Sequence, residues 1–307
     1  MKTALKINVL SFLIFFSTSP ALGSQRERAL ALLKKAYSPH YKVVSTKKNI
    51  TLLGCKNSTV RIQSPDPVTK RPRNIVLSVF KPAYREAHEA ILIVPPTGGE
   101  NTIDRGYAYL FCQDGYDAVI ISTWDQIEDV DMNLKTQDIA VVRAVSAIRT
   151  AVDFVKKPTG ILATSMGSIL TSVTLAVESR FKAAFLIVGG APISEIMATS
   201  QNKKVRVIRE ARMKAHHFTT ADQYRRALKK AMKIDLNSLV QPIAGLKLKM
   251  VIATADDTVP TKNQFQLWNS FGRPENIQLK TGHTSAVLKT FSSHSHDVLE
   301  FFDRSMR

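Results

Sequence analysis

Residues 160–170 read GILATSMGSIL, and two hydrophobic patterns meet in this segment at Ser165. Residues 160–163 form a short apolar run typical of a buried strand, and apolar residues recur at helical spacing from residue 166 onward. Ala163 and Gly167 stand two places before and after the serine, where a sharp turn between strand and helix has no room for a bulky side chain. The segment therefore predicts a strand, a tight turn and a helix, with the Ser165 hydroxyl held out as a candidate nucleophile.

Outward from this segment, short apolar runs alternate with longer amphipathic ones from residue 89 to the end of the chain. This alternation is typical of an α/β fold, a mostly parallel sheet with helices on both faces. In such sheets the side chains that carry chemistry gather at the carboxyl ends of the strands. The expected strands are 90–94, 118–121, 160–163, 183–188, 248–253 and 277–280, and the expected helices are 103–114, 136–155, one that starts at 166, 262–271 and 285–302.

Two regions lie outside this alternation. Before residue 89 we expect a helix over 26–36 and β runs at 50–54, 59–63 and 74–80. Residues 191–244 interrupt the alternation and predict an inserted helical cap, in which Thr220 and Gln223 form a capping box. Within residues 201–233 eleven basic side chains stand against two acidic ones. This charge is typical of the solvated face of amphipathic helices, and a dedicated anion-binding surface is the alternative.

The first 23 residues predict a signal peptide that is not part of the fold. Lys2 and Lys6 give it a positive start, residues 9–16 are its apolar core, and Ala21 and Gly23 are the small residues of a cleavage site. The core is shorter than the roughly 20 residues that a transmembrane helix needs. We therefore expect one domain over residues 24–307, with 191–244 as its cap, in the periplasm or outside the cell.

The composition indicates a globular protein with a strong positive charge. Apolar residues make up 44% of the chain, and the net charge of +18 becomes +16 without Lys2 and Lys6. This charge favours contact with anionic envelope surfaces. Its basic residues are not interleaved with aromatic ones, so no nucleic-acid partner is predicted. After export, Cys55 and Cys112 would meet oxidising conditions, where one disulfide and two separate buried thiols both fit the sequence.

A serine hydroxyl needs a base to take its proton and a third group to orient that base. Two later strand ends offer these groups: the adjacent Asp256 and Asp257 follow the strand 248–253, and His283 follows the strand 277–280. No other histidine follows a strand at this edge, and no two of them have the spacing of metal ligands on one helix face. Phosphate-binding, dinucleotide-binding and zinc-protease motifs are also absent from the sequence, so no metal or cofactor is predicted.

With these motifs the chain resembles the α/β-hydrolase superfamily from about residue 75 onward. The resemblance rests on the elbow around Ser165, on an Asp-x-x-Val-Pro segment that ends at Pro260, and on Gly282 and His283 before the last helix. The elbow departs from the usual pattern, because Ala163 stands where the family has glycine. The resemblance implies an α/β-hydrolase fold whose catalytic serine, acid and histidine follow one another in this order along the chain.

The resemblance also assigns the acid and the oxyanion donors. Asp256 matches the family pattern, and Asp257 is the alternative acid, which otherwise suits the N-cap of the next helix. One oxyanion donor should be the N–H of Met166. The other should come from the loop PPTGGE at 95–100, in which the prolines have no N–H, so that Thr97 is the first candidate and Gly98 the second. The family usually has His-Gly at the start of this loop, and this chain does not.

These features predict an exported serine hydrolase that cleaves a carboxylic ester, or a related thioester or amide, through an acyl-enzyme. Its expected partner is a small-molecule or lipid-like acyl substrate. Lipase, aminopeptidase and acyltransferase activities on the same triad are alternatives, because one fold hosts all of them. A non-catalytic binding protein that keeps the hydrolase fold is the alternative from another class.

Overall fold

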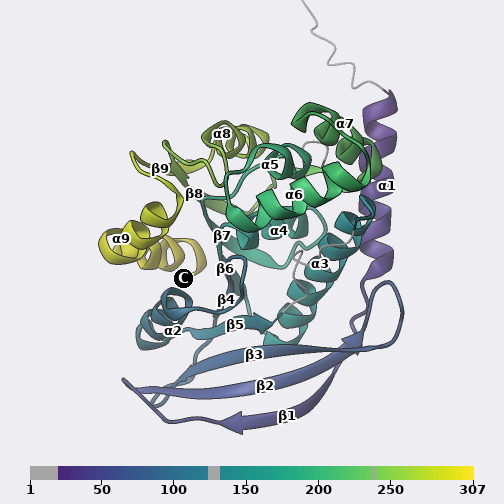
Figure 1. Cartoon of the computed structure of the whole chain (residues 1–307). Helices are drawn as coiled ribbons and strands as arrows, with labels where there is room; N and C mark the ends of the chain where they lie inside the picture. The colour runs from purple at the N-terminus through teal and green to yellow at the C-terminus, as the bar shows by residue number, and fades with distance from the viewer. Residues whose placement is uncertain (1–19, 124–131, 237–238) are drawn as a thin grey trace, which may run out of the picture.

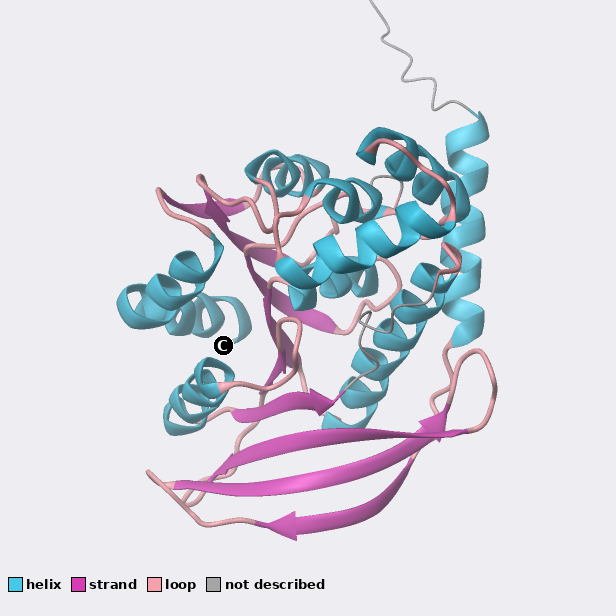
Figure 2. Ribbon diagram, viewed as in Figure 1, coloured by secondary structure: helices cyan, strands magenta, loops and turns pink. Residues whose placement is uncertain are grey.

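The computed structural model describes residues 20–123, 132–236 and 239–307, which form one sheet with helices on both faces (Figures 1 and 2). Within these residues the strand order is β1-β2-β3-β5-β4-β6-β7-β8-β9. The first three pairings, up to β3 with β5, are antiparallel, and the pairings from β5 to β9 are parallel. The strands are β1 (Lys42–Lys48), β2 (Cys55–Pro65), β3 (Pro72–Pro82), β4 (Ala90–Val94), β5 (Asp117–Thr123), β6 (Thr159–Thr164), β7 (Phe181–Ile187), β8 (Lys247–Ala253) and β9 (Glu275–Leu279).

The helices divide between the two faces of the sheet. Alternate residues of β4 point to opposite faces, so that Leu92 and Val94 pack with α3 and α4 while Ile91 and Ile93 pack with α2 and α9. This double burial explains the continuous apolar runs of the central strands. The helices are α1 (Pro20–Ala36), α2 (Thr102–Asp114), α3 (Thr136–Val155), α4 (Met166–Leu175), α5 (Ile193–Thr199), α6 (Lys203–Ala215), α7 (Ala221–Ala231), α8 (Thr261–Ser270) and α9 (His283–Met306). The predicted mostly parallel α/β architecture is confirmed.

The N-terminal β region differs from the prediction in one place. No strand forms at 50–54, where the chain instead turns through Leu53 and Gly54, which have φ angles of 52° and 74°. The strand before this turn is β1, which is exposed along its whole length and has only two apolar residues, Val43 and Val44, next to each other, so that no alternation marks it. The predicted β run at 50–54 is therefore wrong, and the structure leaves most of its side chains in solvent.

Three helices, α5, α6 and α7, lie between β7 and β8 and are grouped together (green in Figure 1). The predicted capping box of α7 is present, because the Thr220 hydroxyl accepts from the N–H of Gln223 and the Gln223 side chain accepts from the N–H of Thr220. A buried carboxylate holds the segment that follows α7. Asp138 of α3 accepts from the N–H groups of Lys233 and Ile234 at 2.7 and 3.0 Å. The three helices are therefore joined to the body of the fold by polar contacts as well as apolar packing.

The structure decides between the two alternatives for the cysteines, one disulfide or two separate thiols. Cys55, at the start of β2, and Cys112, in α2, form a disulfide, with their Cα atoms 6.1 Å apart. The predicted signal peptide lies outside the described residues up to residue 19, and residues 20–23 form the start of α1. In the part of the chain that the structure describes, no helix combines the length and apolar character of a membrane span.

Candidate active site

The sharp turn predicted at Ser165 is present between β6 and α4. Ser165 has a φ of 55° and a ψ of −118°, a strained conformation for a residue with a side chain. Its N–H donates to the carbonyl of Ile187 at 2.8 Å, which fixes the turn to β7. A Cβ at Gly167 would lie 2.3 Å from the Val94 carbonyl oxygen, so only glycine allows α4 to start this close to β4. The fold thus holds the nearly buried Ser165 hydroxyl in one position.

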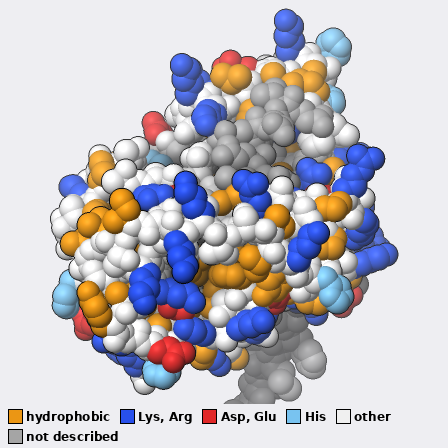
Figure 3. Space-filling model, turned by 90° about the horizontal axis from the view of Figure 1, so that it is seen from below, with side chains coloured by type: hydrophobic (Ala, Val, Ile, Leu, Met, Phe, Trp, Pro, Cys, Tyr) orange, Lys and Arg blue, Asp and Glu red, His pale blue; other side chains and the backbone are white. Residues whose placement is uncertain are grey.

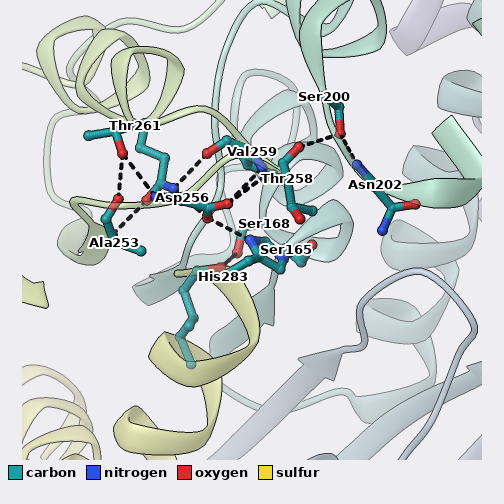
Figure 4. Close-up of polar contacts among 12 residues, drawn as sticks. Ser165, Ser168, Ser200, Asn202, Ala253, Asp256, Thr258, Val259, Thr261 and His283 are labelled. Carbon is teal, nitrogen blue, oxygen red and sulfur yellow. Dashed lines mark hydrogen bonds and ion pairs between the residues drawn. The ribbon is translucent and has the colours of Figure 1, made fainter. Parts of the chain in front are cut away.

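His283 contacts both other members of the predicted triad (Figure 4). Its Nε2 lies 2.8 Å from the Ser165 Oγ, and its Nδ1 lies 2.6 Å from a carboxylate oxygen of Asp256. An ionised carboxylate can only accept, so Nδ1 carries the proton and Nε2 is free to accept from the serine hydroxyl. His283 is the first residue of α9, after a loop that follows β9. The structure therefore brings together three side chains that are far apart in the sequence.

Asp256 is buried, and several donors hold its carboxylate. One oxygen accepts from the N–H groups of Thr258 and Val259 at 2.8 and 3.0 Å, and the other accepts from the Gln264 side chain at 2.7 Å as well as from His283. These bonds stabilise the charged carboxylate in a place that water does not reach. Sequence reasoning missed Gln264, because a glutamine inside a helix gives no signal of its own.

Asp257 does not take either role that the sequence left open for it. Its side chain is exposed, and only its backbone carbonyl is used, as an acceptor for the N–H of Gln201 at 2.9 Å. The N-cap of α8 is Pro260, with no side-chain cap, so the expected N-cap role of Asp257 is wrong. The helix start is held instead by the Thr261 hydroxyl, which donates to the Ala253 carbonyl at 2.8 Å. Of the two adjacent carboxylates, only Asp256 contacts His283.

The two predicted oxyanion donors lie beside the serine. Met166 is the first residue of α4, where N–H groups have no partner within the helix. Thr97 lies in the turn after β4, and among the described residues its N–H has no hydrogen-bond partner. Both residues line the cavity that contains Ser165 and His283. Gly98, the second candidate, does not line this cavity.

The loop that carries Thr97 is anchored at its far end by Glu100, which sequence reasoning also missed. One carboxylate oxygen of Glu100 accepts from the Ser78 hydroxyl of β3 at 2.7 Å and from the Ser122 hydroxyl of β5. The other oxygen lies 2.7 Å from the Nε of Arg105. A carboxylate next to a glycine pair on a loop could have suggested such an anchor, but its partners lie in strands far away in the sequence.

The cavity above the triad is small, at about 170 Å³. Its walls come from the oxyanion loop, from α4, from α5 and the start of α6, from the loop after β8 and from the start of α9, and half of its lining residues are apolar. Hydrogen bonds fix two polar residues of this wall, Ser200 and Asn202. The Ser200 hydroxyl donates to the Thr258 carbonyl at 2.6 Å and accepts from the N–H of Asn202 at 3.2 Å (Figure 4). The lining residues are Pro96, Thr97, Ser165, Met166, Ile169, Ile196, Ser200, Asn202, Val205, Thr258, Val259 and His283.

Two further features of the described residues, a second cavity and a group of possible metal ligands, lie apart from the triad. A larger cavity of about 500 Å³ lies between α1, the end of α4 and residues 239–244. One group of side chains on α9, His296, Asp297 and Glu300, has ligand atoms within 4.8 Å of one another, an arrangement that the sequence did not predict. Two of these three side chains are exposed, and none contacts the triad. Neither of these two features brings a nucleophile, a base and an acid together as the cavity at Ser165 does.

No model of a known protein family matches this chain, and no curated protein sequence matches it. Solved structures do match its fold. Acetyl xylan esterase 1 from Thermoanaerobacterium sp. JW/SL YS485 superposes with a TM-score of 0.65 at 13% identity over 94% of each chain. The acetyl xylan esterase from Paenibacillus sp. R4 gives 0.67 at 13% identity, over 94% of this chain and 96% of the other.

A peptidase is also among the structural neighbours. The acylaminoacyl peptidase of Pyrococcus horikoshii superposes with a TM-score of 0.56 at 14% identity, over 83% of this chain and 42% of the peptidase. At such low identities the likeness concerns the fold and not the reaction. The chain has the α/β-hydrolase fold that its motifs predict, and it shares this fold with esterases and with peptidases.

Proposed function

We propose that this protein is a serine hydrolase that cleaves small carboxylic esters through an acyl-enzyme, with Ser165, His283 and Asp256 as its catalytic triad. The observation that carries the proposal is the unbroken chain of contacts from the Ser165 Oγ through both nitrogens of His283 to Asp256, at 2.8 and 2.6 Å. A binding protein without turnover would have no need of a nucleophile in a strained turn, aligned with a base and a buried acid.

In the proposed reaction the Ser165 oxygen attacks the carbonyl carbon of the ester while the Nε2 of His283 takes its proton. Asp256 stabilises the imidazolium that forms. The N–H groups of Met166 and Thr97 donate to the oxyanion of the tetrahedral intermediate. His283 then gives the proton to the departing alcohol. A water molecule, deprotonated by the same nitrogen, releases the acid from the serine and restores the enzyme.

The size of the cavity supports a short acyl group. Its volume of about 170 Å³ is well below the roughly 300 to 1,000 Å³ of sites that enclose drug-sized ligands. Apolar side chains such as Ile169, Ile196 and Val205 form much of its wall, which suits a small acyl chain better than a charged one. The acetyl ester substrates named for two structural neighbours belong to this class. We favour esters over amides because an alcohol leaves more easily than an amine.

We further propose that the mature protein starts near Ser24 and acts in the periplasm or outside the cell, as one hydrolase domain with residues 191–244 as its cap. The basic start, apolar core and small residues of the first 23 positions support export. The disulfide between Cys55 and Cys112 supports it independently, because such bonds persist in oxidising compartments and are rare in the cytosol.

The test is a series of nitrophenyl esters of increasing acyl length, given to the purified mature protein and to Ser165→Ala. The proposal predicts turnover of the shortest esters, a steep fall in kcat/KM as the acyl chain grows, and a loss of at least about 10⁴-fold in the variant. Equal rates for short and long esters would contradict the small acyl site. Turnover of aminoacyl nitroanilides in preference to every ester would assign the site to a peptidase.

A further inference from the structure

Four large hydrophobic side chains lie exposed at one end of the β1–β3 region. Ile50, Leu52 and Leu53 are 84%, 51% and 60% exposed, and Tyr84 is 92% exposed. The first three belong to the turn between β1 and β2, and Tyr84 follows β3. The N–H of Ala83 donates to the Gly54 carbonyl at 2.9 Å, which brings these two segments together. We call these four residues the apolar tip, since they form one site and are not scattered over the surface.

The backbone holds the apolar tip in an ordered turn. Leu52 and Cys55 exchange two backbone hydrogen bonds at 3.1 and 2.9 Å, and Leu53 between them has a left-handed φ of 52°. The disulfide of Cys55 fixes the end of this turn to α2. A leucine in a left-handed turn costs conformational energy, and here the residue remains 60% exposed. The arrangement suits a surface that is completed by a partner.

Near the apolar tip the chain carries an excess of basic side chains, Lys47, Lys48, Lys56, Lys81 and Arg85, against the exposed Glu86. Over the whole of residues 40–85, ten lysines and arginines stand against one acidic residue, Asp66, which is buried and bonded to Arg143 at 2.8 Å. Lys56 and Lys81 occupy directly opposite positions on β2 and β3, an arrangement that by itself disfavours the pairing. Figure 3, which views the molecule from below Figure 1, shows Lys and Arg side chains spread over this face with hydrophobic ones between them.

We propose that the β1–β3 region docks on an anionic lipid surface, with the apolar tip inserted at the level of the headgroups and the surrounding lysines on their charges. The apolar tip and the basic side chains near it together favour this partner over others. A polyanion such as a nucleic acid would satisfy the lysines but leave the apolar tip in water, and a second copy of this basic chain would repel the first. A membrane interface offers both an apolar layer and negative charge.

The orientation that follows leaves the triad open to solvent. Phe80 near the end of β3 pairs with Ala118 at the start of β5, so the apolar tip lies at the amino ends of the parallel strands. Ser165 and Asp256 follow the carboxyl ends of β6 and β8, at the opposite edge of the sheet. Docking therefore does not cover the cavity at Ser165. The inference rests on surface chemistry and does not depend on the proposed reaction.

The experiment is flotation of the mature protein with vesicles of neutral lipid, and with vesicles in which about one-third of the lipid is phosphatidylglycerol. The wild type should bind only the anionic vesicles, and about 1 M salt should weaken this binding. Replacing Lys47 and Lys48 by glutamine should reduce the partition coefficient about 25-fold, since each cation near the surface contributes about fivefold. The matched variant Lys229→Gln/Lys230→Gln, on exposed positions of α7, should bind like the wild type.

The apolar tip is tested by the triple change Ile50→Ser, Leu53→Ser and Tyr84→Ser, with thermal unfolding as the check that the variant is folded. Its binding should fall at least about tenfold. The control Val207→Ser/Leu288→Ser, which removes two hydrophobic side chains that are each 51% exposed elsewhere, should have no effect. Absence of wild-type binding, or unchanged binding of the triple variant, would overturn the proposal. Self-association that the triple variant abolishes would overturn it in favour of a second copy.

Discussion

Two loops at the carboxyl edge of the sheet hold the candidate site in different ways. The loop after β8 fixes Asp256 through four donors, two from the backbone and one each from Gln264 and His283. The loop after β4 presents Thr97 in an exposed turn, and its nearest side-chain anchor is Glu100, three residues away. The carboxylate of Asp256 is thus held directly by several hydrogen bonds. The N–H of Thr97 is positioned only indirectly, through the anchor of its loop at Glu100.

The difference indicates how each side should respond to change. A carboxylate with several donors keeps its place when one donor is lost, so mutations there act through charge and through the proton of His283. A backbone donor on a loop depends on whatever positions the loop. Mutations around Glu100 should therefore affect turnover through geometry, without touching any reacting atom.

The largest expected effect is that of Asp256→Asn. The amide would favour the wrong tautomer of His283, and kcat for a short nitrophenyl ester should fall about 10⁴-fold with little change in KM. The adjacent variant Asp257→Asn is the matched control and should retain full activity, because the Asp257 side chain is exposed. A large loss in the control together with an active Asp256→Asn would reverse the assignment of the acid.

A second effect concerns stability on the oxyanion side of the site. The disulfide of Cys55 and Cys112 closes a separation of 57 residues and ties α2, the helix after the oxyanion loop, to β2. The double change of both cysteines to alanine should lower the free energy of unfolding by about 4 kcal/mol, measured by urea denaturation. Turnover at low temperature should persist, because Glu100 still anchors the start of α2. A loss below about 1 kcal/mol would mean that other contacts already fix this helix.

A third prediction tests the anchor itself. Glu100→Gln removes the charge that accepts from Ser78 and Ser122 and pairs with Arg105. We expect kcat to fall about 10- to 100-fold while KM changes little, since the oxyanion donor acts in the transition state. The exposed Glu86→Gln serves as the control. A rise in KM without a change in kcat would show that Glu100 shapes substrate binding instead.

The last prediction concerns the dependence of stability on pH near the same loop. Burial, with a further contribution from the charge of Glu100, raises the pKa of Asp104 to about 7. The folded state then binds this proton more tightly than the unfolded state, so stability should fall as the pH rises from about 4 to about 7, by at most ~1.4 kcal/mol per unit. Asp104→Asn should flatten this slope in urea titrations. An unchanged slope would exclude Asp104 as its source.

Much of this architecture follows from local sequence patterns. The helix over 136–155 and the elbow at Ser165 were predictable because apolar periodicity and small flanking residues are local properties. Gln264 and Glu100 were not predictable, because their partners come from other elements and give no mark in the sequence. The triad of the candidate site could be predicted from the sequence, because its serine, acid and histidine follow the ends of predicted strands in the order typical of this fold. The residues that hold the triad in place could not be predicted.

The error at residues 50–54 has a physical reason. A short apolar run between turn residues predicts a strand, because strands in folded proteins usually have this pattern. The structure instead exposes Ile50 and Leu53 in a turn that follows β1, an exposed strand without alternation of apolar and polar residues. Places where sequence patterning and structure disagree are often functional sites, and here the disagreement marks the apolar tip.

The central claim is that Ser165 is an activated nucleophile, and labelling with a fluorophosphonate tests it most directly. The Ser165 oxygen should attack the phosphorus and expel fluoride, leaving a covalent adduct that peptide mass spectrometry locates on the segment containing residue 165. We expect rapid labelling of the wild type, none of Ser165→Ala, and much slower labelling of His283→Ala. A folded wild-type protein that remains unlabelled, or an adduct on any other serine, would contradict the account.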